Sequence, residues 1–241
     1  MTGAAPAASA DELKRAAGEH AASLVQSGMV VGLGTGSTAV FATRRIGELI
    51  ASGALSDVVG IPTSRATEAE ARRVGIPLMP DAMPRDVDLT IDGADEVSPA
   101  LDLIKGGGGA LLREKIVAQA SRRVVIVVDE SKISPALGMR HALPVEVARF
   151  GVESLERFIR SLGGRPMLRK TESGGVYETD QGNWILDCVF SPILEPRPLA
   201  ERLSERAGVV EHGLFCGLAS EVVVAAAAGV RVMVRSRATR Q

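Results

Sequence analysis

The stretch MVVGLGTGST at residues 29–38 decides the fold. Its first half is an apolar run with the length of a buried strand, and its second half is a glycine-rich turn. The apolar spacing of residues 39–50 then predicts a helix. Because strand, tight turn and helix in this order form the repeating unit of parallel sheets, we expect an α/β protein.

The same alternation continues on both sides of this unit. The further predicted elements are helices over 11–27, 66–74 and 111–120 and strands over 58–61, 76–79, 89–91 and 124–128. Hydrophobic residues make up 46% of the chain and aromatic residues only 3%, which suits buried parallel strands covered by helices. With right-handed crossovers, these elements predict a Rossmann-like open, mostly parallel sheet with helices on both faces.

The texture of the sequence changes over residues 139–205. Short alternating strands are predicted over 165–170, 176–178 and 184–190, and helices over 152–161 and 198–204. We expect this segment to form a smaller inserted α+β domain that serves as a lid or an interface. The valine-rich runs 209–215 and 221–234 predict that the chain then rejoins the main sheet. Residues 1–138 and 206–241 would thus form one Rossmann-like catalytic domain.

The charge balance limits the class of partner. With 28 basic and 29 acidic residues the formal net charge is -1, so no overall field attracts the chain to nucleic acid or to an anionic membrane. An anionic ligand must therefore be bound by local groups. Near the C-terminus, Arg231, Arg235, Arg237 and Arg240 are interpreted as a solvated chain end without a function of its own.

The cysteines and the N-terminus bear on the compartment. Cys188 and Cys216 have neither the spacing of metal ligands nor that of a disulfide framework, so we expect two small buried groups in a reducing environment. Residues 1–10 lack the basic start and the apolar core of a signal peptide, and no run has membrane-spanning length. The sequence therefore predicts a cytoplasmic protein.

The first loop that could carry chemistry is the glycine-rich turn at residues 34–38. In an open parallel sheet ligands bind where strands end and helices begin, and backbone N–H groups at such a turn suit a phosphate. Gly34, Gly36 and Ala39 also fit the dinucleotide pattern G-x-G-x-x-A, and a purely structural turn is a third alternative. The next strand ends in residues 62–64, Pro-Thr-Ser, without the acid that a dinucleotide site expects.

Two later loops are equally polar. Asp92 and Asp95 follow a predicted strand and could accept hydroxyl protons of a sugar, although a turn with solvated acids is the simpler alternative. Lys105 heads a run of four glycines, 106–109, in front of a predicted helix. Such a run is costly in any regular element, so it indicates either close backbone approach to an oxyanion or a mobile surface loop.

Other polar residues carry weaker signals on their own. Taken alone, Glu114 is interpreted as a surface carboxylate on a helix and Lys132 as an exposed loop lysine. His20, His141 and His212 lie in unrelated settings, without the spacing of a metal hydrolase or a catalytic triad.

Four motifs, taken in order, carry a resemblance to a known family. GLGTGST at 32–38, TIDGADE at 90–96, IKGGG at 104–108 and REK at 113–115 together resemble the type A ribose-5-phosphate isomerases. Supporting segments lie at 129–132, 143–147, 162–166 and 208–215, so the resemblance spans nearly the whole chain. The sequence departs from the family pattern at 216–229, which is rich in Ala and Val and lacks an expected Asp.

The resemblance implies an activity and a set of site residues. The activity is the interconversion of D-ribose 5-phosphate and D-ribulose 5-phosphate through an enediolate, in the non-oxidative branch of the pentose phosphate pathway. Glu114 corresponds to the general base, with Asp92, Asp95 and Lys105 around the reacting end of the sugar. The substrate-binding residues implied are Thr35, Gly36, Ser37, Thr38, Asp92, Gly93, Ala94, Asp95, Lys105, Gly106, Gly107, Gly108 and Lys132, and Lys14 is a further candidate for the phosphate.

The resemblance also implies that the reaction needs no metal or organic cofactor, since proton transfer requires only a base and electrostatic stabilisation. The expected partner is a small sugar phosphate, with no nucleic acid and no membrane. The expected assembly is a homodimer, or a homotetramer built from two dimers.

Three rival functions remain to be weighed. An amino-sugar phosphate deaminase would need a histidine among these loops, and a CoA transferase would need its nucleophilic glutamate in another setting. A non-catalytic sugar-phosphate sensor would keep the pocket without the base, and the joint presence of Glu114, Asp92, Asp95 and Lys105 argues against it.

Overall fold

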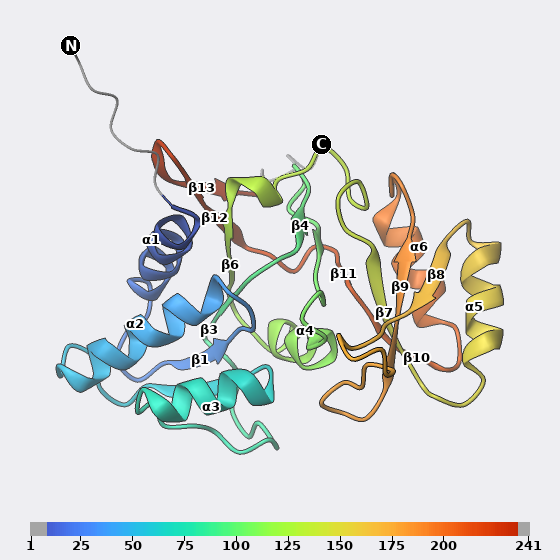
Figure 1. The fold of residues 1–241 in the computed structure, drawn as a ribbon. Helices are drawn as coiled ribbons and strands as arrows, with labels where there is room; N and C mark the ends of the chain where they lie inside the picture. The colour runs from blue at the N-terminus through green and yellow to red at the C-terminus, as the bar shows by residue number, and fades with distance from the viewer. Residues whose placement is uncertain (1–8, 236–241) are drawn as a thin grey trace, which may run out of the picture.

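A six-stranded sheet forms the centre of the computed structural model, which describes residues 9–235 (Figure 1). The strand order is β13-β12-β6-β3-β1-β2. The bounds are Val30–Leu33 for β1, Val59–Pro62 for β2, Leu89–Asp92 for β3, Val124–Asp129 for β6, Glu221–Ala226 for β12 and Gly229–Val234 for β13. All neighbouring pairs are parallel except β12 and β13. The prediction of an open, mostly parallel sheet is confirmed.

Helices cover both faces of this sheet, as its buried inner strands require. Their bounds are Ala10–Ala22 for α1, Ala39–Ala51 for α2, Arg65–Arg73 for α3 and Leu111–Gln119 for α4. On one face, α1 and α2 share an apolar core with Leu33 and Val127. On the other face, α4 packs Ala118 against Ile126. Alternate residues of one strand thus serve two separate cores.

The first helix begins where its sequence dictates. Ser9 and Glu12 form a reciprocal capping box, in which each side chain accepts the backbone N–H of the other residue. Two orphan donors at the start of α1 are satisfied in this way. The predicted helix is therefore found, with its acidic residues at the positive end.

Two smaller sheets follow from the rest of the chain. An antiparallel sheet has the order β10-β7-β9-β8, and a three-stranded sheet has the order β11-β5-β4. Their bounds are Leu143–Val147 for β7, Arg165–Leu168 for β8, Trp184–Val189 for β9, Val209–His212 for β10, Glu96–Val97 for β4, Leu103–Ile104 for β5 and Leu214–Phe215 for β11. Helices α5 (Val152–Ser161) and α6 (Pro196–Ser204) cover the four-stranded sheet, and Figure 1 shows α4 between this small sheet and the central one.

Two predicted strands are absent from the described residues. Residues 76–79 form only an isolated bridge from Leu78 to Gly60, because Pro77 has no N–H to donate to a ladder. Residues 176–178 likewise form a single bridge between Val176 and Lys170, beside a tight turn. The first of these predictions extended the central sheet by one strand too many.

The segment 209–215 was predicted to rejoin the central sheet, and this prediction was wrong. Its two halves enter different small sheets, as β10 and β11, on either side of Gly213. A Cβ at Gly213 would lie 2.2 Å from the carbonyl oxygen of Lys105, so only glycine permits this crossing between sheets. The chain returns to the central sheet at Glu221. The domain division at residues 139–205 stays a prediction.

Of the described C-terminal arginines, only Arg235 departs from the interpretation of a solvated end, because Arg231 is exposed. Arg231 lies in edge strand β13, and the Arg235 guanidinium lies 3.8 Å from the Asp102 carboxylate. Arg237 and Arg240 lie outside the described residues. So do residues 1–8 of the N-terminal segment in which no signal peptide was predicted.

Candidate active site

The predicted site residues come together at one edge of the central sheet. A pocket of about 110 Å³ opens there. It is lined by Thr35, Gly36, Ser37, Thr38, Gly93, Ala94, Asp95, Lys105, Gly106, Gly107, Gly108, Glu114 and Lys132. Asp92 lies directly behind this lining, bonded to Lys105. Five stretches separated by up to about 97 positions in sequence, from Thr35 to Lys132, therefore meet in space.

The register of the sheet explains why the first two loops meet. β1 and β3 are parallel neighbours, with Leu33 opposite Ile91, so both strands end at the same edge. The backbone N–H of Thr35 donates to Asp92 Oδ1 at 3.1 Å. A Cβ at Gly34 would lie 2.3 Å from that same oxygen. The glycine is therefore required by the close approach of the two loops.

Hydroxyl groups fix the glycine-rich turn from the other side. The Thr35 hydroxyl lies 2.8 Å from the hydroxyls of Thr63 and Ser64 and 3.1 Å from that of Thr67. Sequence reasoning used the end of β2 only as an argument against a dinucleotide site and missed this anchoring role. A cluster of hydroxyl residues after a strand, beside a glycine-rich turn, is the signal that was available.

A buried charge cluster forms the floor of the pocket. The Lys105 ammonium lies 3.0 Å from Asp92 Oδ2 and 3.3 Å from Glu114 Oε1, and it donates to the Gly93 carbonyl at 2.5 Å. The exposed fractions are 3% for Lys105, 2% for Asp92 and 4% for Glu114. One buried ammonium thus serves two carboxylates.

Burial controls the protonation of this cluster. It raises the pKa of Glu114 to about 8, against the opposing effect of the Lys105 ammonium and with a smaller contribution from the Asp92 charge. Burial also raises the pKa of Asp92, although Lys105 and two backbone N–H groups favour its charged form. Burial works against the Lys105 charge as well, but Asp92 and Glu114 outweigh it and raise the pKa of the ammonium. Glu114 is therefore placed to exchange protons near neutral pH.

Glu114 itself has one oxygen without a partner. Its Oε2 atom is buried and accepts no hydrogen bond from any group in residues 9–235. The simple interpretation of Glu114 as a surface carboxylate is wrong, because the glycine run and Lys105 enclose this side of α4. A buried, unsatisfied acceptor that lines a pocket is available to a ligand.

The glycine run is an ordered loop rather than a mobile one. The Gly107 N–H donates to Asp95 Oδ2 at 2.7 Å, and a Cβ at Gly107 would lie 2.7 Å from Asp95 Oδ1. Gly106 has φ +98°, which favours glycine. The run is therefore needed for close packing against Asp95 on one side and for the backbone turn on the other.

Of the two lysines that remain as candidates, one lines the pocket and the other does not. Lys132, in a short 3₁₀ helix at Glu130–Lys132, is half-buried and lines the pocket. Lys14 on α1 is not among the lining residues, and its ammonium lies 4.0 Å from Asp11. No histidine lines the pocket, which argues against the deaminase alternative. Within residues 9–235, no three His, Cys, Asp or Glu side chains are arranged to hold a metal ion, and no helix is long and apolar enough to cross a membrane.

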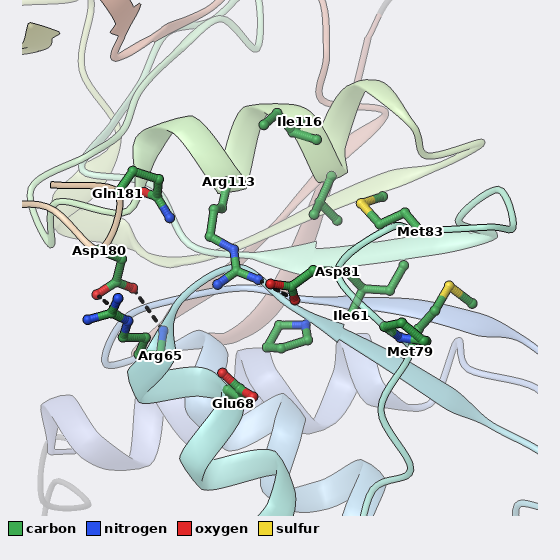
Figure 2. A pocket seen from close by; sticks show the side chains of 13 residues that line it. Ile61, Arg65, Glu68, Met79, Asp81, Met83, Arg113, Ile116, Asp180 and Gln181 are labelled. Carbon is green, nitrogen blue, oxygen red and sulfur yellow. Dashed lines mark hydrogen bonds and ion pairs between the residues drawn. The ribbon is translucent and has the colours of Figure 1, made fainter. Parts of the chain in front are cut away.

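A second, larger pocket of about 330 Å³ lies beside α3 and α4 and contains none of the predicted site residues (Figure 2). Its arginines already face acids: Arg65 lies 4.0 Å from Asp180, and Arg113 lies 3.1 Å from Asp81. Size alone therefore does not mark the reactive site. The smaller pocket holds the buried, unpaired carboxylate oxygen and the shifted pKa values.

Similarity to known proteins agrees with this geometry. The family model for ribose 5-phosphate isomerase A (phosphoriboisomerase A) matches residues 59–229. The ribose-5-phosphate isomerase A of Chloroflexus aurantiacus is 55% identical over 223 residues, which cover 92% of this chain and 93% of that protein.

Solved structures give the same result. A D-ribose-5-phosphate isomerase in complex with phospho-erythronic acid matches with a TM-score of 0.93 and 34% identity, covering 95% of this chain and 100% of that one. The ribose 5-phosphate isomerase of Plasmodium falciparum matches with a TM-score of 0.90 and 40% identity, covering 94% and 100%. The chain therefore belongs to the ribose 5-phosphate isomerase A family.

Proposed function

We propose that this protein interconverts D-ribose 5-phosphate and D-ribulose 5-phosphate through an enediolate, with Glu114 as the base that moves the proton. The observation that carries this proposal is the buried Oε2 atom of Glu114, which lines the pocket and has no partner in residues 9–235. The reaction belongs to the non-oxidative branch of the pentose phosphate pathway.

The proton transfer needs one base and one stabilising cation. Glu114 removes the proton from C2 of the open-chain aldose, the electron pair forms the C1–C2 double bond, and negative charge develops on O1. The O2 hydroxyl proton then passes to O1, Glu114 returns its proton to C1, and O2 becomes the ketone oxygen. The Lys105 ammonium, 3.3 Å from Glu114 Oε1, is placed to stabilise the charge that moves between O1 and O2.

The two aspartates support different parts of this step. Asp92 is fully engaged, since it accepts from the N–H groups of Thr35 and Gly93 and pairs with Lys105, so we assign it the positioning of the cation. Asp95 is only half-buried and binds Gly107 through Oδ2, which leaves Oδ1 open to the sugar. We assign Asp95 the hydroxyl proton that moves when the ring opens.

The phosphate is assigned to the other end of the pocket. Ser37 and Thr38 precede α2, and the N-cap residue Thr38 makes no capping bond with its side chain. Free N–H groups and the positive end of a helix favour an anion at this position. Lys132, which also lines the pocket, adds a positive charge. Lys14 stays a weaker candidate because it is absent from the lining.

The experiment is the conversion of ribose 5-phosphate to ribulose 5-phosphate by chelator-treated protein, with Glu114→Gln beside it. We expect wild type to turn over and Glu114→Gln to lose about 10³-fold in kcat or more. Glu172→Gln is the matched control, because Glu172 is exposed on a turn far in sequence from the pocket loops. Its kcat should equal that of wild type.

Binding separates the enzyme from the sensor alternative. Phospho-erythronic acid ends in a planar carboxylate, which resembles the planar, oxygen-bearing end of the enediolate. It is therefore a suitable probe of the pocket. An inactive wild type that still binds this acid by calorimetry would favour a sensor. A Glu114→Gln variant with wild-type turnover would remove the base assignment.

The assembly and compartment are also proposals. We propose a cytoplasmic homodimer, with a homotetramer as the larger form, on the basis of the family and of exposed apolar side chains such as Phe150 and Leu194. Analytical ultracentrifugation tests the assembly, and a monomer at micromolar concentration would contradict it. Cell fractionation tests the compartment.

A further inference from the structure

An arginine of the small sheet reaches across to the active-site loop. Arg169 follows β8, and its Nη1 atom donates to the carbonyl oxygens of Gly106 and Gly107, both at 3.0 Å. Its Nε and Nη2 atoms donate to the two oxygens of Asp187 on β9, at 2.9 and 2.5 Å. The side chain is 13% exposed. All three nitrogens of this guanidinium thus donate either to the loop or to Asp187.

A tyrosine in the connection between β8 and β9 contacts the next residue of the loop. The Tyr177 hydroxyl donates to the Gly108 carbonyl at 3.2 Å, and the Arg169 guanidinium lies 5.6 Å from the centre of the Tyr177 ring. A Cβ at Gly109 would lie 2.2 Å from the tyrosine oxygen. Three consecutive carbonyls of the glycine run therefore point toward the small sheet.

The direction of these carbonyls fixes the direction of the N–H groups. In a planar trans peptide, the C=O of one residue and the N–H of the next point in opposite directions. The Gly106 carbonyl faces Arg169, and the Gly107 N–H accordingly donates to Asp95. The Gly107 carbonyl also faces Arg169, so the Gly108 N–H points away from it, where Gly108 lines the pocket. Within residues 9–235 this N–H has no acceptor.

We propose that Arg169, oriented by Asp187, is a positioning residue of the isomerase reaction: it holds the peptide planes of residues 106–108 so that the Gly108 N–H donates to the oxygen that gains charge in the enediolate. The small sheet thereby contributes to catalysis without touching the substrate. This inference rests on the proposed function and adds a backbone donor to the Lys105 ammonium.

The residue type fits this role. Binding two carbonyls and both oxygens of one carboxylate requires the planar fork of donors that only a guanidinium has. A lysine keeps the charge but offers a single nitrogen, which cannot reach both Asp187 and the two glycine carbonyls at once. Arg169→Lys therefore removes the geometry and keeps the charge.

The test is steady-state kinetics of Arg169→Lys with ribose 5-phosphate. We expect kcat to fall about 10- to 100-fold, as for a misplaced catalytic donor, while KM changes less than about threefold. Affinity for phospho-erythronic acid should fall in proportion to kcat/KM. If Arg169 served only the stability of the fold, Arg169→Lys would lower the folded fraction. The kcat of the folded protein and its affinity for phospho-erythronic acid would then equal those of wild type.

Arg149→Lys is the matched control. Arg149 also donates to a glycine carbonyl, that of Gly182 at 2.8 Å, and pairs with Glu178 at 2.5 Å, but neither partner lines the pocket. Its kcat should stay within about twofold of wild type. Asp187→Asn is a second variant, which keeps one acceptor for Arg169 and should lower kcat in the same direction by a smaller factor.

The outcomes separate this inference from the proposed function. If wild type isomerises the sugar and Glu114→Gln does not, while Arg169→Lys and Asp187→Asn both keep wild-type kcat, the positioning role is overturned and the proposed function stands. If wild type is inactive, the proposed function fails first. Should Arg169→Lys not fold, a full kcat in folded Asp187→Asn overturns the inference by itself.

Discussion

Two successive residues of α4 enter two different buried charge clusters. Glu114 belongs to the cluster that we propose to be catalytic, where Oε1 lies 3.3 Å from Lys105 and Oε2 has no partner in the described residues. Lys115 belongs to a second cluster on the side of the small sheet. Its ammonium lies 2.6 Å from Glu211 Oε1, 2.6 Å from the His212 carbonyl and 3.3 Å from His212 Nδ1. All three of its protons can be used.

The second cluster is satisfied throughout. Burial lowers the pKa of His212 to about 3, and the neighbouring Lys115 charge acts in the same direction, so the imidazole is neutral at pH 7. Its Nδ1 atom accepts from the Leu214 N–H, and Nε2 can then donate to the Ser204 hydroxyl at 3.1 Å. The pair of clusters shows that burial of charge alone does not mark a catalytic site. What distinguishes Glu114 is an unpaired oxygen on a residue that lines the pocket, since Glu146 Oε2 and Arg235 Nε are also buried without a partner in residues 9–235 but neither residue lines it.

The largest expected effect is the loss of stability in Lys115→Met, which tests the second cluster. Removing the cation leaves Glu211 without its buried partner, and breaking such a pair costs about 3 kcal/mol of unfolding free energy. The folded fraction should keep a kcat within a few-fold of wild type, because Lys115 does not line the pocket. Urea unfolding and kinetics on the same samples measure both quantities.

The double variant Lys115→Met/Glu211→Gln is the control for this prediction. It removes both charges, so it should recover part of the lost stability. A single variant as stable as wild type would show that the second cluster contributes nothing to folding, and the contrast with Glu114 would disappear.

The next effect is a pH dependence that belongs to the catalytic cluster. The base must be ionised, and the pKa of Glu114 is about 8, so kcat/KM should fall about tenfold per pH unit below 8 and about 100-fold by pH 6. Above pH 8 the rate should level off, since the raised pKa of Lys105 keeps the cation charged. A profile with its only limb near pH 6, where the substrate phosphate titrates, would contradict the assignment.

The smallest expected effect is the decrease in the free energy of unfolding that results from ionising the buried Glu114. The folded-state pKa of Glu114 lies above the ordinary value of 4.5, so the folded state binds the proton more tightly than the unfolded state does. The free energy of unfolding contributed by this group therefore falls as pH rises from 4.5 through about 8. Glu114→Gln does not ionise and should be about 1 kcal/mol more stable than wild type at pH 8. Thermal unfolding at pH 5 and pH 8 measures the difference, and a variant less stable at pH 8 would refute it.

The sequence was informative where backbone constraints act locally. The glycine runs at 34–38 and 106–109 marked loops that need close backbone approach, and the predicted parallel sheet indicated that polar residues following its strands were candidates for a site. The burial of Glu114 was not derivable from its place on a helix, because it depends on a loop folding over one side of α4. The family resemblance supplied that residue instead.

Contacts between distant segments were beyond the reach of pattern reasoning. Arg169 directly follows a short strand whose alternation is typical of any antiparallel sheet, and it meets Gly106 from 63 positions away. Thr67 likewise reaches Thr35 across the end of a strand. The segment 209–215 was misplaced because valine content does not distinguish one sheet from another. Only Gly213 signalled the break between β10 and β11.

The parallel pairing of β6 with β12 has a further consequence, for how this protein can change in length. Asp129 ends β6 and Glu221 begins β12, so the whole segment between them is the crossover that joins two neighbouring strands. The entropy of closing a long excursion grows slowly, by about 0.6 kcal/mol for each doubling of its length. We therefore expect the register of the central sheet to tolerate insertions or deletions in this crossover, provided that they preserve its contacts with the rest of the chain, such as that of Arg169 with the glycine run.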